Sequence, residues 1–339
     1  MRVSKVLSIV VVAVASLIVL AAIVVAIRLF APSRTEAQQN FPPADGQQAI
    51  SPVGDAAVFS QANGTSSFLY RKDPSTGKSV RLTSVASGIE SEASFSHNGK
   101  LVVYSFASMP DSKSVVWVVG SDGSNPHSVT GKDEDAVHPV FSPDDSKVFY
   151  AASNFTGHYS PIVVPARHNW DVFSIPVKAD AAVAGAVPTQ VTHASLYELQ
   201  SLDIAADDVG QGGTKLLIST SGYPIGALLE EFIVGDPGRN KIFQPHVPGE
   251  SSVGPSYGDA RFIHDGMDVV FLAATDTSGG NYDYNVYSMS DVTGSEIKRL
   301  THLKGMTKEL KVLPDGKVTF VNGGVTYVLD VGTQNVKPL

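Results

Sequence analysis

The chain has 339 residues, 43% of them hydrophobic, and a formal net charge of −8, so it is long enough to bury a large core. It contains no cysteine, which excludes disulfide bonds, thiolate metal sites and a cysteine nucleophile. Its lysines and arginines form no cluster, and a nucleic-acid backbone is bound by concentrated positive charge, so we expect no nucleic-acid partner.

The first segment of the chain is apolar. Residues 6–27 contain only Ser8 and Ser16 as polar residues, and a helix of that length spans roughly 33 Å, enough to cross the hydrocarbon core of a membrane. We predict that residues 1–30 form a membrane anchor or signal-anchor helix; a long cleavable signal peptide is the alternative. A slight excess of positive charge before the span favours a cytoplasmic N-terminus. The remainder would then face the periplasm or the cell exterior, joined through residues 31–45, a linker rich in Pro, Gln and Ala.

Six copies of one pattern follow the linker. Each copy has an apolar strand end, then a turn of Ser, Pro, Asp, Asn and Gly, as at residues 95–99 (Phe-Ser-His-Asn-Gly) and 312–316 (Val-Leu-Pro-Asp-Gly). Such turn residues tolerate positive φ or bond to their own backbone, and the Val-, Phe- and Tyr-rich segments that follow are typical of strands. The strand ends of the six copies are Ile50, Phe95, Phe141, Ile204, Phe262 and Val312.

The period of the repeat predicts the architecture. One four-stranded propeller blade takes about 40–50 residues, and the longer intervals on either side of Ile204 predict insertions in blades three and four. A second marker, a Leu-Thr or Val-Thr pair at a strand end, recurs at Leu82-Thr83, Val129-Thr130, Val191-Thr192 and Leu300-Thr301. We therefore predict an all-β, six-bladed β-propeller over residues 46–339. Blade six would be continuous in sequence, and the ring would close by packing of blade one against blade six.

The repeat resembles the TolB-like, or WD-like, β-propeller family over residues 46–339. The resemblance implies the propeller fold and no single activity, because such repeats serve binding proteins, protease side domains and lyases. The α/β domain that precedes the propeller in TolB has no counterpart in this sequence. TolB-like lyases use histidine-rich metal sites on the propeller axis, whereas one histidine of this chain, His138, falls on the inner strands.

The inner strands carry a candidate polar ring. Because side chains alternate along a strand, one register faces blade-to-blade packing and the other faces the channel. The channel register predicts a polar ring made of Glu92, His138, Asp259, Arg261, Glu309 and Lys311, in which Glu92, His138, Asp259 and Glu309 share one level of the channel. Carboxylates and imidazole suit a divalent cation, but the basic residues also suit internal ion pairs, such as Asp259 with Arg261 or Glu309 with Lys311. We predict the ion pairs, no cofactor and no metal; a divalent cation is the alternative.

A second candidate surface lies in the insertion of blade three. Aromatic and basic residues gather there, and insertions on one face of a propeller often carry binding surface. We predict a binding loop with His158, Tyr159, Arg167, His168 and Trp170. No nucleophile motif or phosphate loop is present. The sequence therefore favours an envelope binding or scaffold module for a protein, peptide or glycan partner. The alternative is a hydrolase or lyase acting on a carbohydrate or small molecule at the channel.

Overall fold

The computed structural model describes residues 48–339 except 55, 111, 158–165, 179–185, 208–212, 222–226, 244–256, 278–280 and 293–294. The chain divides into two compact units, residues 1–42 and 43–339, and every described residue belongs to the second. The predicted anchor and the predicted linker therefore lie outside the described residues. In the part that is described, no helix has the length and hydrophobicity needed to cross a membrane.

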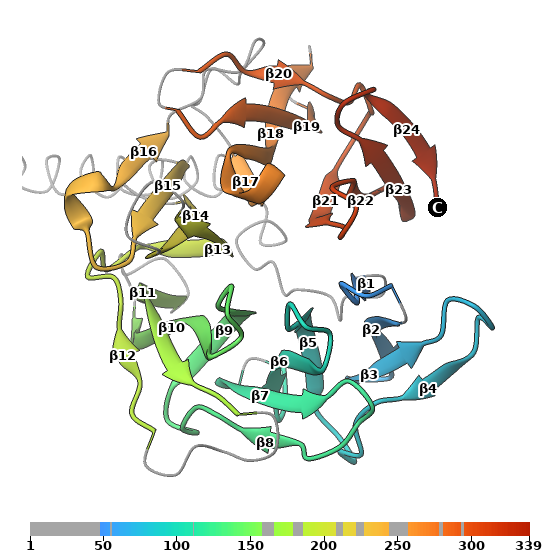
Figure 1. Ribbon diagram of the computed structural model, residues 1–339, viewed down its shortest axis with the longest axis vertical. Helices are drawn as coiled ribbons and strands as arrows, with labels where there is room; N and C mark the ends of the chain where they lie inside the picture. The colour runs from blue at the N-terminus through green and yellow to red at the C-terminus, as the bar shows by residue number, and fades with distance from the viewer. Residues whose placement is uncertain are drawn as a thin grey trace, which may run out of the picture. The chain divides into compact units, whose positions relative to one another are not determined.

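The described residues form strands and two short 3-10 helices, with no α-helix (Figure 1). The strands of the first three blades are β1 (Gln48–Ile50), β2 (Ala57–Asn63), β3 (Ser66–Lys72), β4 (Ser79–Arg81), β5 (Ile89–Phe95), β6 (Leu101–Ala107), β7 (Ser114–Gly120), β8 (His127–Ser128), β9 (Asp135–Phe141), β10 (Lys147–Gly157), β11 (Ala166–Pro176) and β12 (Thr189–Gln190).

The second half of the unit repeats the arrangement. Its elements are β13 (Glu198–Asp207), β14 (Gly213–Ser221), β15 (Leu228–Ile233), η1 (Pro237–Arg239), β16 (Lys241–Phe243), β17 (Tyr257–Ile263), η2 (His264–Gly266), β18 (Asp268–Thr277), β19 (Asn281–Ser290), β20 (Lys298–Arg299), β21 (Thr307–Val312), β22 (Val318–Asn322), β23 (Val325–Asp330) and β24 (Asn335–Pro338).

Each group of four strands is an antiparallel meander, consistent with the predicted β-propeller. Blades three to six are separate four-stranded sheets, and blades one and two are joined by one parallel bridge between Ser67 and Ile89. Blade six consists of β21–β24 alone, as predicted. The innermost strand of each blade borders the centre of the ring, and the outermost strand lies at the rim (Figure 1).

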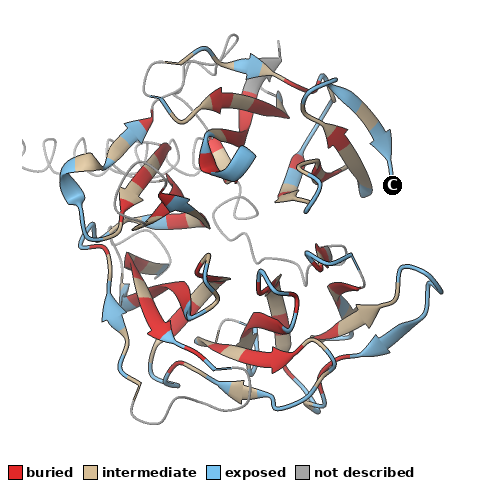
Figure 2. Ribbon diagram, viewed as in Figure 1, coloured by how far each residue is buried: buried red, intermediate tan, exposed pale blue. Residues whose placement is uncertain are grey.

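The hydrophobic core lies between blades rather than within them. Each of the five hydrophobic clusters formed by described residues joins two consecutive blades, from the pair one and two to the pair five and six. The second and third strands are the most buried parts of most blades, and the outer strands are exposed (Figure 2). Stacked cross-strand aromatic pairs contribute to these clusters, for example Phe271 with Tyr287 at 5.9 Å between ring centroids. Blade-to-blade burial is what the apolar register of each strand predicts.

The Leu-Thr and Val-Thr pairs have a structural role. In blade three, the Thr192 hydroxyl accepts the backbone N–H of Val172 at 2.8 Å and donates to Asp171 Oδ1 at 2.8 Å. The same bonds join Thr301 to Val286 and Asn285 in blade five. The threonine thus satisfies a backbone donor where the short outer strand ends, since an unpaired buried N–H is costly.

The repeated turn follows each inner strand. In blade two, Gly99 N–H donates to Ser96 O at 2.9 Å, and Ser96 N–H closes the turn on Leu101 O at 3.0 Å. Gly99 has a φ of +71°, a conformation that glycine adopts without steric cost. Blade three has Asp145 at the equivalent position, with a φ of +58°. The exception predicts that the aspartate side chain has a role of its own.

Candidate functional site

The inner strands carry a repeated irregularity at the predicted ring. The pairing register shifts next to Glu92, His138, Asp259 and Glu309, and all four residues have positive φ, between +33° and +62°. Such β-bulges re-aim side chains and leave backbone groups unpaired. Blade four departs from the alignment, because its shift falls at Gln200, one residue before the position predicted from the repeat. The conformation is unfavourable for these residue types, so their side-chain bonds must offset it.

Glu92 links the inner strands of blades two and three. Its Oε1 lies 3.0 Å from His138 Nδ1, and its Oε2 accepts the backbone N–H of His138 at 2.8 Å and the Ser105 hydroxyl at 2.7 Å. Burial opposes ionisation of Glu92, but the His138 imidazolium and these donors outweigh it and lower the Glu92 pKa to about 2. Burial would likewise lower the His138 pKa, but the Glu92 carboxylate raises it. The pair is therefore a charge-assisted hydrogen bond.

Asp259 makes the equivalent link from blade five to blade six. Its Oδ2 accepts the backbone N–H of Leu310 at 2.6 Å, and its Oδ1 lies 2.6 Å from Arg261 Nη2. The ion pair between Asp259 and Arg261 was predicted from the sequence. In blade four the same role falls to a neutral side chain, since Ser201 Oγ accepts the N–H of Ala260 at 3.0 Å. At three blade junctions, therefore, an inner-strand side chain accepts a hydrogen bond from a backbone N–H of the next blade.

Asp203 belongs to this set, although the sequence did not single it out as a site residue. Its Oδ2 accepts the backbone N–H of Phe262 at 2.7 Å. Burial raises the Asp203 pKa, and the Arg261 guanidinium partly offsets that effect. The signal was present in the repeat, because Asp203 occupies the register position that holds Arg261 in blade five and Lys311 in blade six.

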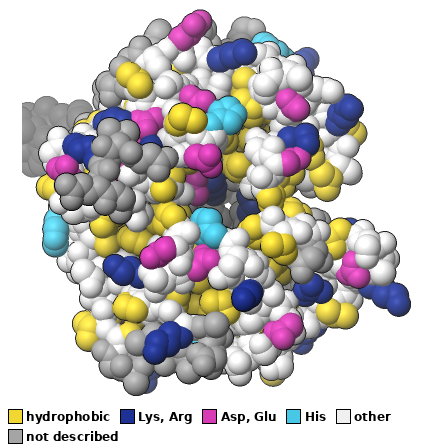
Figure 3. All heavy atoms as spheres, in the orientation of Figure 1, with side chains coloured by type: hydrophobic (Ala, Val, Ile, Leu, Met, Phe, Trp, Pro, Cys, Tyr) yellow, Lys and Arg dark blue, Asp and Glu magenta, His cyan; other side chains and the backbone are white. Residues whose placement is uncertain are grey.

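Blade six contributes Glu309 and Lys311 to the polar ring. Glu309 Oε1 lies 3.1 Å from Lys308 Nζ, so Lys308 and not Lys311 is its ion-pair partner among the described residues. Lys311 Nζ instead lies 3.5 Å from the backbone oxygen of Ala93 in blade two. Burial, together with the charge of Arg261, lowers the Lys311 pKa to about 8, against the opposing effect of nearby carboxylates. Acidic, basic and histidine side chains surround the central opening (Figure 3).

The described part of the predicted binding loop of blade three is a β-strand. Arg167, His168 and Trp170 all lie on β11, and His168 and Trp170 are buried. Trp170 Nε1 donates to Arg167 O at 3.2 Å, and His168 Nδ1 lies 3.0 Å from Tyr197 O. The prediction of a loop was wrong for these three residues, because the insertion extends the β10–β11 hairpin. His158 and Tyr159 lie outside the described residues.

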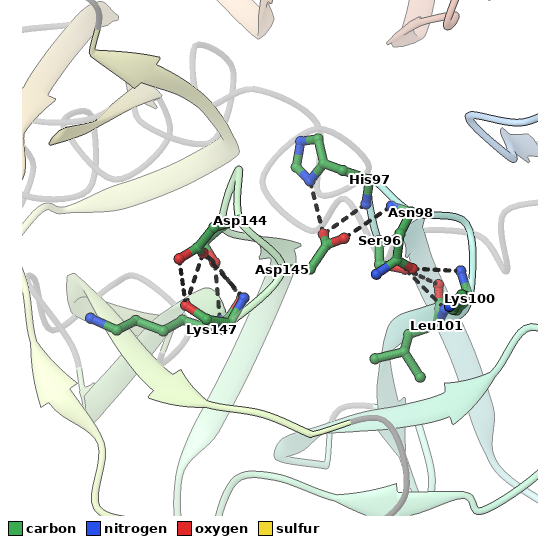
Figure 4. Close-up of polar contacts among 10 residues, drawn as sticks. Ser96, His97, Asn98, Lys100, Leu101, Asp144, Asp145 and Lys147 are labelled. Atoms are coloured by element: carbon green, nitrogen blue, oxygen red, sulfur yellow. Dashed lines mark hydrogen bonds and ion pairs between the residues drawn. The ribbon is translucent and has the colours of Figure 1, made fainter. Parts of the chain in front are cut away.

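A turn-to-turn clamp joins blades two and three on the face shown in Figure 4. Asp145 Oδ1 accepts the backbone N–H of His97 at 2.7 Å and lies 3.0 Å from His97 Nδ1. Its Oδ2 accepts the N–H of Asn98 at 2.9 Å. The neighbouring Asp144 bonds within its own turn, to Ser142 and Ser146. Asp145 therefore replaces the usual glycine in order to hold the adjacent blade.

We expect Asp145→Ala to destabilise the fold by about 0.5–1.5 kcal/mol, because two exposed backbone donors lose their carboxylate and bond to water instead. Asp145→Gly loses the same bonds but relieves the positive φ, so its loss should be smaller by about 1 kcal/mol. Urea unfolding of the two variants and of the parent chain measures both effects. Equal losses in the two variants would show that the backbone conformation contributes nothing.

An open groove of about 430 Å³ lies beside blades five and six. Its floor includes the buried side chains of Ile263 and Met289, and charged side chains stand at its edge: His264, Asp268, Glu296 and Lys298. His264 Nδ1 lies 2.7 Å from Asp268 Oδ2. This groove was not predicted, because its residues come from several strands that are adjacent only in the fold.

Solved structures of several different proteins share this fold. A putative TolB from Agrobacterium tumefaciens is 17% identical, with a TM-score of 0.53 over 76% of this chain and 80% of that one. The fold is that of a TolB-like β-propeller. An oligogalacturonate lyase in complex with manganese is 14% identical, with a TM-score of 0.56 over 86% and 75% of the two chains.

The third similar structure comes from a protein–protein assembly. A chain of a nidogen/laminin complex is 11% identical, with a TM-score of 0.56 over 83% of this chain and 91% of that one. No family model and no curated protein matches the sequence. At these identities the TolB-like likeness is one of fold. In the part of the TolB-like propeller that is described, no group of three or more His, Asp or Glu side chains is placed to hold a metal ion.

Proposed function

We propose that this protein is an envelope binding module, held to the membrane by residues 1–30, whose propeller presents a rigid surface to a protein, peptide or glycan partner in the periplasm or outside the cell. The proposal rests on the bonding partners of the carboxylates in the polar ring. Glu92 and Asp259 each engage a cation and a backbone donor of the next blade. These carboxylates serve as links between blades, which leaves recognition to the surface.

The groove beside blades five and six is the surface that best fits this role. It combines an apolar floor with charges of both signs at its edge, as protein-binding patches do. The likeness to a chain of the nidogen/laminin complex supports a propeller used for protein association. A protein or peptide partner would place an apolar side chain on Ile263 and Met289 and pair its own charges with Glu296 and Lys298.

Photocrosslinking in cells tests this surface. A photoreactive residue in place of Lys298, at the groove, should give a discrete adduct with one partner. The matched control replaces Lys337, which is also an exposed lysine and lies on β24 outside the groove lining. The proposal predicts the adduct at position 298 and not at 337; adducts of the same size and yield at both positions, or at neither, contradict it.

The alternative is a lyase or hydrolase at the channel, favoured by the likeness to the manganese-bound oligogalacturonate lyase. We expect added Mn²⁺ to leave the melting temperature of the chain unchanged, because the ring carboxylates already have partners. A ligand that binds only the folded state raises the melting temperature, and the rise grows with the ratio of ligand concentration to Kd. A rise with Mn²⁺ that disappears in His138→Ala would favour the enzyme over the binding module.

A further inference from the structure

The two ends of the ring carry different connections. Each blade is a four-stranded antiparallel meander, so the chain returns to the end at which the blade began, and all six inner strands run in the same direction. The turns after the first and third strands of each blade lie at one end, which includes His264 and Glu296 of the groove. The turns after the second strands and the connections between blades lie at the other end, where β1 begins at Gln48. We call these two ends the groove end and the linker end.

Three apolar side chains are exposed together at the linker end of blades five and six. Met306 lies in the connection to β21, Val325 begins β23 and Leu339 follows β24, and they are 53%, 43% and 74% exposed. Asn322 Nδ2 donates to Met306 O at 3.3 Å, and Asn322 is the cross-strand partner of Val325. Leu339 N–H donates to the backbone oxygen of Thr326, the residue after Val325, at 2.9 Å. These contacts make Met306, Val325 and Leu339 neighbours, and we call them the linker-end cluster.

Cations flank this cluster. Lys304 and Lys308 stand two residues before and two residues after Met306. Lys304 is exposed, and the Lys308 side chain is 50% exposed although its Nζ lies 3.1 Å from Glu309 Oε1. The Asp283 carboxylate accepts a backbone N–H of the same loop at 2.7 Å. Exposed apolar side chains beside lysines are typical of surfaces that bind at a membrane interface, because anionic headgroups attract the cations.

The chain that precedes the propeller reaches the same end of the ring. The apolar run ends at Ile27, and β1 begins at Gln48. For the groove end to face a membrane that holds this run, the roughly 20 connecting residues would have to pass along the height of the ring, about 25 Å for a strand of seven residues, and would lose conformational freedom. Anchoring through residues 1–30 therefore favours the linker end as the side that faces the membrane.

We propose that the linker-end cluster docks on the anionic lipid surface of the membrane that holds residues 1–30, so that the groove faces away from the membrane. The inference rests on the membrane attachment in the proposed function and adds an orientation to it. Met306, Val325 and Leu339 would enter the headgroup region, and Lys304 would lie against the anionic headgroups. The opposite end would then present the groove, with charges of both signs at its edge, to the partner.

Fluorescence quenching by lipids tests the orientation, and the absence of cysteine in the chain makes each introduced thiol unique. Met306→Cys and Val325→Cys place a fluorophore in the cluster. Val53→Cys and Met267→Cys are the matched controls at the groove end, where the parent side chains are 65% and 64% exposed. The full chain is reconstituted into phosphatidylcholine vesicles that contain phosphatidylglycerol and a nitroxide-labelled lipid. Ser16→Cys, inside the apolar run, reports separately on the membrane attachment.

We expect quenching at positions 306 and 325 to be about threefold stronger or more than at 53 and 267, since interfacial side chains lie within about 5–10 Å of the headgroup boundary and the groove end is a strand length farther away. Lys304→Glu should weaken the quenching at position 325, and so should high salt, because the attraction to anionic lipid is screened. Lys100→Glu, which changes an exposed lysine at the groove end, should leave it unchanged.

The possible failures are distinguishable. Strong quenching at Ser16→Cys with equal quenching at the other four positions would overturn the docked orientation and leave the anchor in place. No quenching at Ser16→Cys would overturn the membrane attachment and the orientation together. A photoreactive residue at position 306 that captures a discrete protein in cells, with no lipid quenching at that position, would assign the cluster to a protein partner and would also overturn the proposal.

Discussion

Glu92→Ala should destabilise the propeller by about 3 kcal/mol. The substitution removes the partner of a charged histidine and leaves the backbone N–H of His138 and the Ser105 hydroxyl without their acceptor. Breaking one side of a buried pair costs more than the pair contributes, because the remaining charge stays desolvated. Glu92→Gln keeps the acceptor and loses the charge, so its cost should be about half as large. Urea unfolding at pH 6 measures both.

The cost of Glu92→Ala should depend on pH in a defined way. The folded-state pKa of Glu92 lies below its ordinary value of 4.5, so its contribution is complete above pH 4.5 and is lost as the pH falls toward 2. The folded-state pKa of His138 lies above its ordinary value of 6.5, so its contribution is complete below pH 6.5 and is lost as the pH rises through the raised value. The difference from the parent chain should therefore be greatest between about pH 4.5 and 6.5.

Glu296→Ala is the matched control, because Glu296 is an exposed carboxylate at the edge of the groove. Its effect should stay within about 0.5 kcal/mol at every pH. A double-mutant cycle with His138→Gln isolates the pair itself. A cost for Glu92→Ala that is flat from pH 4 to 9 would show that the imidazolium contributes nothing to it.

The sequence predicted the features of this fold that repeat. One repeated sequence unit accounts for the turn glycines, the Thr192 and Thr301 markers and the continuous blade six. Each copy needs the same turn after its inner strand and the same hydrogen bonds where its outer strand ends. The pair of Asp259 with Arg261 was also predictable, because two residues apart on a strand share a face. The pairing of Glu92 with His138 was not predicted, although the sequence placed both residues at one level of the channel.

Features that occur at only one place in the ring could not be predicted from the sequence. The bulge at Gln200 moves the blade-four register by one residue without a local signal, and the extended β10–β11 hairpin was taken for a loop because its length resembled an insertion. An ionic network among the described residues joins blades four and five through residues that are distant in sequence.

That network gives the second large effect: Asp291→Ala should destabilise the fold by about 3 kcal/mol. Asp291 follows β19 of blade five and contacts two lysines of blade four, with its Oδ2 2.6 Å from Lys215 Nζ and its Oδ1 in an ion pair with Lys241. Glu231, which is 1% exposed, completes the set through Lys241 at 3.0 Å. Burial opposes ionisation of Asp291, but hydrogen bonds from the lysines outweigh it and lower its pKa.

Removal of Asp291 leaves Lys215, 6% exposed, with a buried charge whose remaining contacts are Gly266 O at 2.6 Å, Glu231 at 3.9 Å and the Phe262 ring at 5.1 Å. A buried ammonium that has lost its nearest carboxylate is the costly product of such a substitution. Asp315→Ala is the control: Asp315 pairs with Lys317 inside one exposed turn, where ion pairs contribute little. Urea unfolding should show a large loss for Asp291→Ala and almost none for Asp315→Ala. Lys215→Met combined with Asp291→Ala should recover part of the loss, because it removes the orphaned charge; no recovery would trace the loss to something other than that charge.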